Sequence, residues 1–158
     1  SRRVRIDLEG QAIDPDARPP SSERLFHSAI MKARPDVEAV IHAHAPKATA
    51  LALAGLPFLP INTEAAFIGE IPRVPFIMPG TSELAEAIVK HLGKGPAVLL
   101  QNHGLIVAGS SLRRAADMAE VIERSAELII DCYKVGKPPP TLPAEIIAQL
   151  RELGQMMA

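Results

Sequence analysis

Two histidines, His42 and His44, have the spacing of metal ligands on a β-strand. They end the apolar segment 37–41, which we predict to be a strand. Because alternate residues of a strand point to the same face, both imidazoles can reach one ion, at Zn–N distances of about 2.0–2.1 Å. Exposed histidines at strand ends show the same spacing, so the pair alone leaves both interpretations open.

His103 is the third candidate ligand. It lies in the polar stretch 101–104, between the apolar segments 97–100 and 105–108. Polar side chains are costly inside a sheet, so we expect the chain to turn here, with Gly104 permitting a sharp turn beside a ligand. A hairpin turn with a solvated histidine is the alternative. Together with His42 and His44, His103 would complete a three-histidine site for a divalent metal.

Glu23 lies in the first turn of a predicted helix that starts at Ser21 and Ser22. A carboxylate there gains about 0.3–1 kcal/mol from the helix dipole, or it could act as acid/base or fourth ligand beside the histidines. The two serines can cap the helix or hold a phosphate or carboxylate. His27, one helical turn after Glu23, is expected to be structural rather than a ligand.

Strand-like and helix-like segments alternate along the chain, which predicts an α/β domain with helices on both faces of a sheet. The stretch 56–80 is rich in proline and is expected to be irregular, with short strands. We predict strands at 4–8, 37–44, 97–100 and 105–108, and helices at 21–34, 46–53, 81–92, 111–135 and 143–156.

Composition narrows the classes of partner. The 158 residues predict one domain, and 17 basic and 18 acidic side chains give no electrostatic reason to expect a nucleic acid or a membrane as partner. The single cysteine, Cys132, excludes an internal disulfide and fits a reducing compartment, so we expect a cytoplasmic protein. The chain begins with Ser1 rather than methionine, which suggests that it is part of a longer one.

Three blocks of residues together resemble the class II aldolase/adducin family. They are Pro20-Ser21-Ser22-Glu23, the stretch Arg34-Pro35-Asp36-Val37 leading into Val40-Ile41-His42-Ala43-His44, and Leu99-Leu100-Gln101-Asn102-His103-Gly104-Leu105. The resemblance extends from about residue 4 to residue 135. It implies a three-layer α/β/α sandwich with a central, largely antiparallel sheet, formed by a single domain at 1–158 that lacks its N-terminal portion.

The resemblance also implies roles for single residues. His42, His44 and His103 match the zinc ligands of the family, with Mn²⁺ or another divalent metal as an alternative to Zn²⁺. Glu23 matches the catalytic carboxylate, and Ser21 and Ser22 match hydroxyls that bind the substrate. Family members usually form homotetramers with the active site at a subunit interface.

The implied activity is that of a lyase in carbohydrate metabolism, which cleaves a C–C bond in a small hydroxy-carbonyl compound such as a sugar phosphate. Cleavage beside a carbonyl produces an enediolate, which a metal with three neutral histidine ligands stabilises while a carboxylate moves a proton. Region 61–63 lacks the tyrosine that the sugar-phosphate aldolases use there, which favours a decarboxylase or dehydratase acting on a keto or hydroxy acid as the alternative. A non-catalytic, adducin-like scaffold would not need the histidines.

Overall fold

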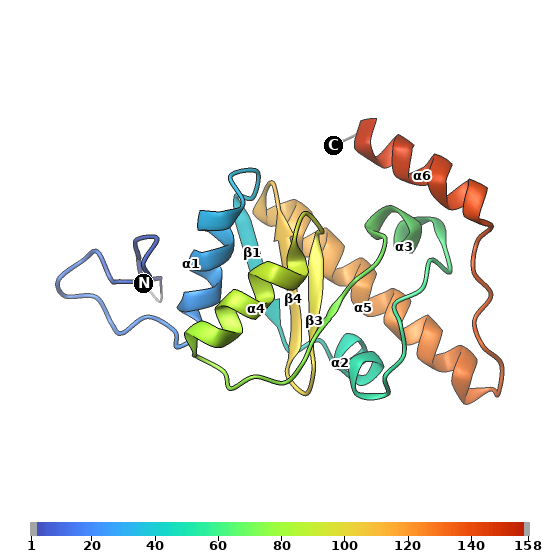
Figure 1. The fold of residues 1–158 in the computed structure, drawn as a ribbon, viewed down its shortest axis with the longest axis horizontal. Helices are drawn as coiled ribbons and strands as arrows, with labels where there is room; N and C mark the ends of the chain where they lie inside the picture. The colour runs from blue at the N-terminus through green and yellow to red at the C-terminus, as the bar shows by residue number, and fades with distance from the viewer. Residues whose placement is uncertain (1–2, 157–158) are drawn as a thin grey trace.

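The computed structural model describes residues 3–156, which fold into helices packed around one sheet (Figure 1). The elements in chain order are α1 (Arg24–Ala33), β1 (Ala39–Ala43), α2 (Pro46–Leu53), α3 (Thr63–Ile68), β2 (Arg73–Val74), α4 (Ser82–Leu92), β3 (Ala97–Leu100), β4 (Gly104–Gly109), α5 (Leu112–Lys134) and α6 (Ala144–Met156). Among the helices of residues 3–156, none combines the length and the apolar character needed to cross a membrane.

The sheet has four strands in the order β1-β4-β3-β2. β4 is antiparallel to both of its neighbours, and the short β2 is parallel to β3. Ala43 at the end of β1 is opposite Leu105, and Leu100 at the end of β3 is opposite Gly104. The end of β1 and the turn between β3 and β4 therefore lie at the same end of the sheet.

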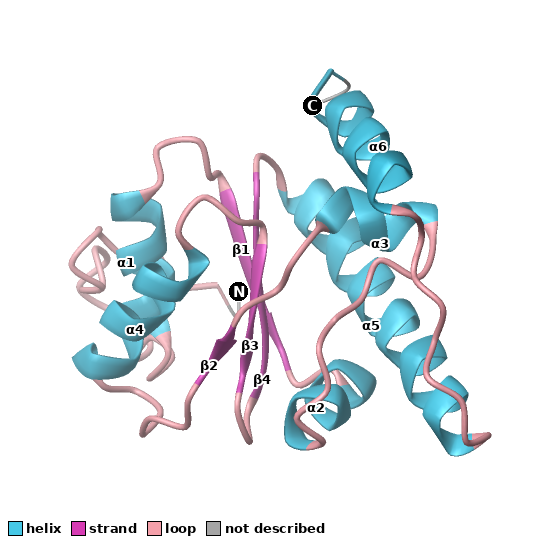
Figure 2. Cartoon of the chain, turned by 45° about the vertical axis from the view of Figure 1, so that its right-hand side comes forward, coloured by secondary structure: helices cyan, strands magenta, loops and turns pink. Residues whose placement is uncertain are grey.

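Helices cover both faces of this sheet, as Figure 2 shows with the strands seen between them. Because side chains alternate along a strand, Val98, Leu100 and Ile106 face α1 and α4, in one core cluster. Leu99, Leu105 and Val107 face α2 and α5, in a second cluster. α6 packs on the outside, against α3. The predicted three-layer α/β/α architecture with a largely antiparallel sheet is confirmed.

Two of the predicted helices, α4 and α5, begin at their capping residues, whereas α1 begins at Arg24, after the two serines expected to cap it. Thr81 Oγ1 accepts a hydrogen bond from the Leu84 amide, and Ser111 Oγ accepts one from the Arg114 amide, each at 3.2 Å. α3 is a helix where we had expected only irregular chain and short strands. Asn62 Oδ1 caps it by accepting from the Ala65 amide at 2.8 Å. The surrounding prolines masked this capping signal.

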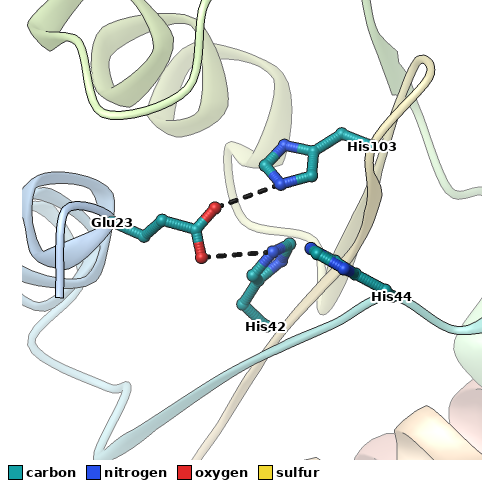
Figure 3. A group of neighbouring side chains, drawn as sticks. All are labelled: Glu23, His42, His44 and His103. Carbon is teal, nitrogen blue, oxygen red and sulfur yellow. Dashed lines mark ion pairs between the residues drawn. The ribbon is translucent and has the colours of Figure 1, made fainter.

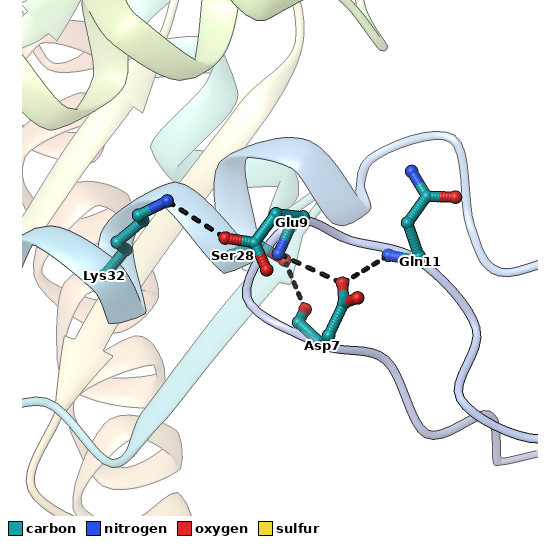
Figure 4. A network of polar contacts seen from close by, with 5 residues as sticks. All are labelled: Asp7, Glu9, Gln11, Ser28 and Lys32. Carbon is teal, nitrogen blue, oxygen red and sulfur yellow. Dashed lines mark hydrogen bonds and ion pairs between the residues drawn. The ribbon is translucent and has the colours of Figure 1, made fainter.

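The strand predicted at 4–8 is wrong. Within residues 3–156 this segment pairs only through an isolated bridge between Ile6 and Ala12, because it folds back on itself. The Asp7 carboxylate accepts from the amides of Glu9 and Gln11, at 3.0 and 2.7 Å (Figure 4). An alternating pattern needs a neighbouring strand to become a ladder, and here the chain turns beside α1 instead.

The N-terminal segment is attached to α1 by polar contacts (Figure 4). Lys32 Nζ donates to Glu9 Oε1 at 3.1 Å, and the Ser28 hydroxyl lies 3.4 Å from the carbonyl oxygen of Asp7. Its apolar residues Leu8 and Ile13 are exposed, so the segment adds little to either core cluster.

Arg34 attaches the C-terminal end of α1 to the turn between α4 and β3. Its Nη1 donates to the carbonyl oxygens of Gly93 and Gly95 at 2.8 and 3.1 Å. Nε and Nη2 donate to the Asp36 carboxylate at 2.8 and 2.6 Å, which lowers the pKa of Asp36 to about 2. The Arg34 side chain is only 15% exposed, whereas that of Asp36 is 65% exposed.

We expect Arg34→Ala to lower the free energy of unfolding by about 1.5–3 kcal/mol, because two carbonyl oxygens, that of Gly95 partly buried, lose a charged donor. Asp36→Asn, the matched control, removes only the exposed partner and should cost less. Urea unfolding of both variants measures the difference. Equal destabilisation by the two would mean that the ion pair, rather than the carbonyl contacts, matters.

Candidate metal and active site

The predicted site residues come from different elements that meet at one end of the sheet (Figure 3). His42 is on β1, opposite Ile106, and faces the α1 side. His44 follows the last residue of β1, and His103 lies in the turn between β3 and β4. Glu23 immediately precedes α1. Positions far apart in the sequence are thereby brought together.

These four side chains form a compact cluster. Each offers one potential ligand atom, and these atoms all lie within 4.8 Å of one another. Glu23 Oε1 is 3.1 Å from His103 Nε2, and Glu23 Oε2 is 3.4 Å from His42 Nε2. The three imidazole rings form a nearly equilateral triangle, because their centroids are 5.0 Å apart for His42 and His44, 4.8 Å for His42 and His103, and 5.1 Å for His44 and His103. The cluster therefore has the donor set and the size of a site for one divalent cation.

The contacts and burial of His42 favour metal binding through its Nε2. Its Nδ1 lies 3.1 Å from the Leu105 carbonyl oxygen, which can only accept, so Nδ1 carries the proton and Nε2 the lone pair. Nε2 is buried and has no hydrogen-bond partner among residues 3–156, although Glu23 lies nearby. Burial lowers the pKa of His42 and favours the neutral form, which a metal requires. A cation would satisfy this orphaned nitrogen, so the residues fit a metal.

The turn that carries His103 is tight. The His103 amide donates to the Leu100 carbonyl oxygen at 3.2 Å, and Asn102 has a φ of 60°. This left-handed conformation is one that asparagine adopts more readily than most residues. The predicted hairpin turn is therefore present, but its histidine side chain is only 13% exposed and faces Glu23.

Gly104 permits the strands to approach each other beside the cluster. A Cβ atom at this position would lie 2.6 Å from the Ala43 carbonyl oxygen. It would also lie 3.3 Å from ring carbons of both His42 and His44. Any larger residue would therefore push apart the backbone and the two imidazoles.

Glu23 does not cap α1. It holds the N-cap position, yet its carboxylate makes no capping bond within the described part of the chain. Its amide donates to Ser21 Oγ at 3.2 Å, and the Arg24 amide donates to the Ser21 carbonyl oxygen at 3.1 Å. The serine turn thus leaves the carboxylate, 22% exposed, to face the histidines.

The remaining candidates lie outside the cluster. Ser21 and Ser22 are both exposed, next to Glu23 in the chain. His27 stacks on Phe26, with ring centroids 4.7 Å apart, and its burial lowers its pKa. Phe26 also packs edge-on against His42, at 5.4 Å. We did not single out Phe26 or the Leu105 carbonyl from the sequence, since only the strand pairing and α1 packing reveal them.

Comparisons with known proteins agree on one family. A family model described as the class II aldolase and adducin N-terminal domain matches residues 1–130. The L-fuculose phosphate aldolase of Escherichia coli O6:H1 is 35% identical over 149 residues, which cover 93% of this chain and 69% of that protein. The 3-oxo-tetronate 4-phosphate decarboxylase of Pectobacterium atrosepticum is 38% identical over 136 residues, which cover 81% and 61%.

A solved structure supports the same relationship. The chain superimposes on an L-fuculose 1-phosphate aldolase with a TM-score of 0.88 and 31% sequence identity. The superposition covers 96% of this chain and 71% of the other. The similarity therefore includes the whole layered core and the end of the sheet where the cluster lies.

We expect Gly104→Ala to lower the free energy of unfolding by about 1–3 kcal/mol through overpacking. It should also weaken Zn²⁺ binding by roughly 10–100-fold, the size typical of changes next to metal ligands. Thermal unfolding and a competitive Zn²⁺ titration measure the two effects. Gly109→Ala is the matched control, because an added Cβ at that far end of β4 lies 3.0 Å from the Ala115 nitrogen. It should cost stability and leave Zn²⁺ affinity unchanged; Zn²⁺ binding of wild-type strength by Gly104→Ala would contradict the argument.

Proposed function

The chain belongs to the class II aldolase and adducin family, and we propose that it is a metal-dependent lyase that cleaves a C–C bond in a small phosphorylated hydroxy-carbonyl compound. The convergence of Glu23, His42, His44 and His103 carries this proposal. A non-catalytic scaffold has no need for three imidazoles and a carboxylate within bonding reach of one point. The named aldolase relatives, which act on sugar phosphates, support the substrate class.

His42, His44 and His103 would hold the metal. Imidazole nitrogens with a neighbouring carboxylate suit Zn²⁺, which we propose as the physiological ion, with Mn²⁺ as the alternative. A bound divalent cation supplies Lewis-acid stabilisation for the negative charge that develops beside a carbonyl. The hydrogen bond from His42 Nδ1 to Leu105 fixes the orientation of this imidazole before any ligand binds.

Glu23 would move the proton. Its two carboxylate oxygens lie 3.1 and 3.4 Å from the nearest histidine nitrogens, so a substrate held at the cluster is within reach of either oxygen. Because the carboxylate is not used to cap α1, it is available to take up a substrate proton at Oε1 or Oε2 and to return it. The backbone contacts to Ser21 hold its Cα in place.

Ser21 and Ser22 would bind the substrate phosphate. Both are exposed and lie at the N-terminal end of α1, where the helix dipole favours an anion. Because they directly precede Glu23, an anion bound to them would lie next to the carboxylate that we propose moves the proton. Two hydroxyls replace only part of the hydration of a phosphate, so further donors are needed.

Decarboxylation is the second candidate reaction. The relative from Pectobacterium atrosepticum is named as a decarboxylase and is 38% identical. Loss of CO₂ beside a carbonyl leaves an electron pair in the same place as aldol cleavage, so the same metal site and the same carboxylate serve both. Residues 61–63 of this chain, Ile61-Asn62-Thr63, contain no tyrosine whose phenol could act as a proton donor, which favours this second reaction.

We further propose a homotetramer in the cytoplasm. Phe67, Phe76 and Met78 are exposed in the stretch 56–80, whereas Phe58 and Ile71 of the same stretch are buried. Exposed apolar side chains of this size favour contact with another subunit. The single cysteine supports a reducing compartment, and the activity would belong to carbohydrate metabolism.

We expect Glu23→Gln to bind Zn²⁺ as the wild type does but to lose about 10²–10⁴-fold in turnover, because an amide cannot exchange the proton. Metal analysis and steady-state kinetics on the same sample separate the two effects. Glu83→Gln is a matched control, since Glu83 occupies the first turn of α4 and lies outside the cluster. Unchanged turnover in Glu23→Gln, with its metal present, would return Glu23 to a structural role.

A substrate screen distinguishes the two reactions. Zn²⁺-loaded protein is incubated with sugar phosphates and with keto acids, and aldehyde or CO₂ release is followed. We expect aldehyde release from a sugar phosphate, abolished in His42→Ala. Release of CO₂ alone would establish the decarboxylase instead, and no turnover of either class would contradict the lyase proposal.

A further inference from the structure

His44 is the least supported of the three histidines. β1 ends at Ala43, so no ladder pairing holds His44 itself. His44 is exposed, whereas the side chains of His42 and His103 are 8% and 13% exposed. Its backbone is therefore fixed by β1 on one side and by α2, which begins at Pro46, on the other.

The beginning of α2 is held by a residue from another helix. Its N-cap residue, Ala45, has no side-chain acceptor, and its first turn contains no acidic residue. Glu123 of α5 supplies the acceptors instead. Glu123 Oε1 accepts from the Lys47 amide and Oε2 from the Ala48 amide, both at 2.8 Å. A carboxylate bonded to two free amides at a helix N-terminus is a strong, charge-assisted arrangement.

The other end of α2 is held in a similar manner. Arg73 Nη1, from β2, donates to the Ala52 carbonyl oxygen at 3.1 Å. The helix has 8 residues, too few to be stable alone, and its charged partners match its dipole at both ends. Arg73 lies at the end remote from His44, so the two contacts allow a matched comparison.

We propose that Glu123 is a positioning residue for His44, acting through the beginning of α2. Only Ala45 and Pro46 separate His44 from the Glu123-bonded amides. A shift of these amides therefore moves His44 relative to the better-supported His42 and His103. This inference rests on the proposed function, since it requires His44 to be a metal ligand.

The test is a double-mutant cycle with Zn²⁺ alone, titrated in competition with a chromophoric chelator. The variants of the 158-residue chain are Glu123→Gln, His44→Ala and the double variant. We expect Glu123→Gln to weaken Zn²⁺ binding about tenfold or more, the scale of other changes behind a ligand. In the His44→Ala background the same change should cause no further loss, because the two residues act along one path.

Arg73→Gln serves as the control for general stability. It removes the bond at the far end of α2 and should lower the thermal midpoint without weakening Zn²⁺ binding. Glu123→Asp retains the carboxylate on a shorter side chain and should bind Zn²⁺ with intermediate affinity, which also provides a measurement should Glu123→Gln not fold.

Three results would overturn the positioning role alone. The first is an equal loss of Zn²⁺ affinity in Arg73→Gln and the Glu123 variants, and the second is a further loss caused by Glu123→Gln in the His44→Ala background. Wild-type Zn²⁺ affinity in the folded Glu123 variants, with weakened binding in His44→Ala, would also remove only this inference. Wild-type affinity in His44→Ala would instead contradict the proposed three-histidine metal site itself.

Discussion

The close approach of β1 and β4 at Gly104 is the constraint on which the site depends. Gly104 has no Cβ atom. A Cβ here would lie only 2.6 Å from the Ala43 carbonyl oxygen, so a larger residue would force the two strands apart. The resulting register puts the Leu105 carbonyl beside His42 and starts the turn that carries His103. One missing side chain thus determines how far the candidate ligands on and after β1 lie from the candidate ligand in the turn between β3 and β4.

Burial favours a neutral His42, and its hydrogen bond through Nδ1 leaves Nε2 free to bind a metal. Burial lowers the pKa of His42 and favours its neutral form, Nδ1 donates to a backbone carbonyl oxygen, and Nε2 has no hydrogen bond within residues 3–156. Neutral imidazoles leave the charge of a bound cation intact. Glu23 is the one carboxylate of the cluster. It lies directly before α1 rather than in the sheet, and its side chain does not cap that helix.

Local signals in the sequence predicted most of the fold. Thr81, Ser111 and Pro46 mark the starts of helices, and the polar break around His103 predicted a turn at a site. The strand predicted at 4–8 failed because alternation says nothing about whether a partner strand is available. α3 was missed because the prolines around it outweighed its capping residue, Asn62.

The residues of the cluster could be anticipated from the sequence, but the contacts that hold them in place could not. The i, i+2 spacing of His42 and His44 requires only a strand, whereas the convergence with Glu23 depends on how α1 packs against β1. The bond from Glu123 to α2 joins residues about 75 positions apart in the chain. No local pattern encodes such a contact.

The candidate site residues come from two layers of the fold. The histidines belong to the sheet and its connections, while Glu23 precedes a helix of the layer that packs on it through Phe26 and Ile30. A change in how α1 packs on the sheet would alter the distance from the Glu23 carboxylate to the three histidines. Under the proposed function, substitutions in the part of this apolar layer that does not contact His42, as Phe26 does, would therefore alter proton transfer while leaving the proposed metal ligands in place, so that the reaction could change without a change of ion.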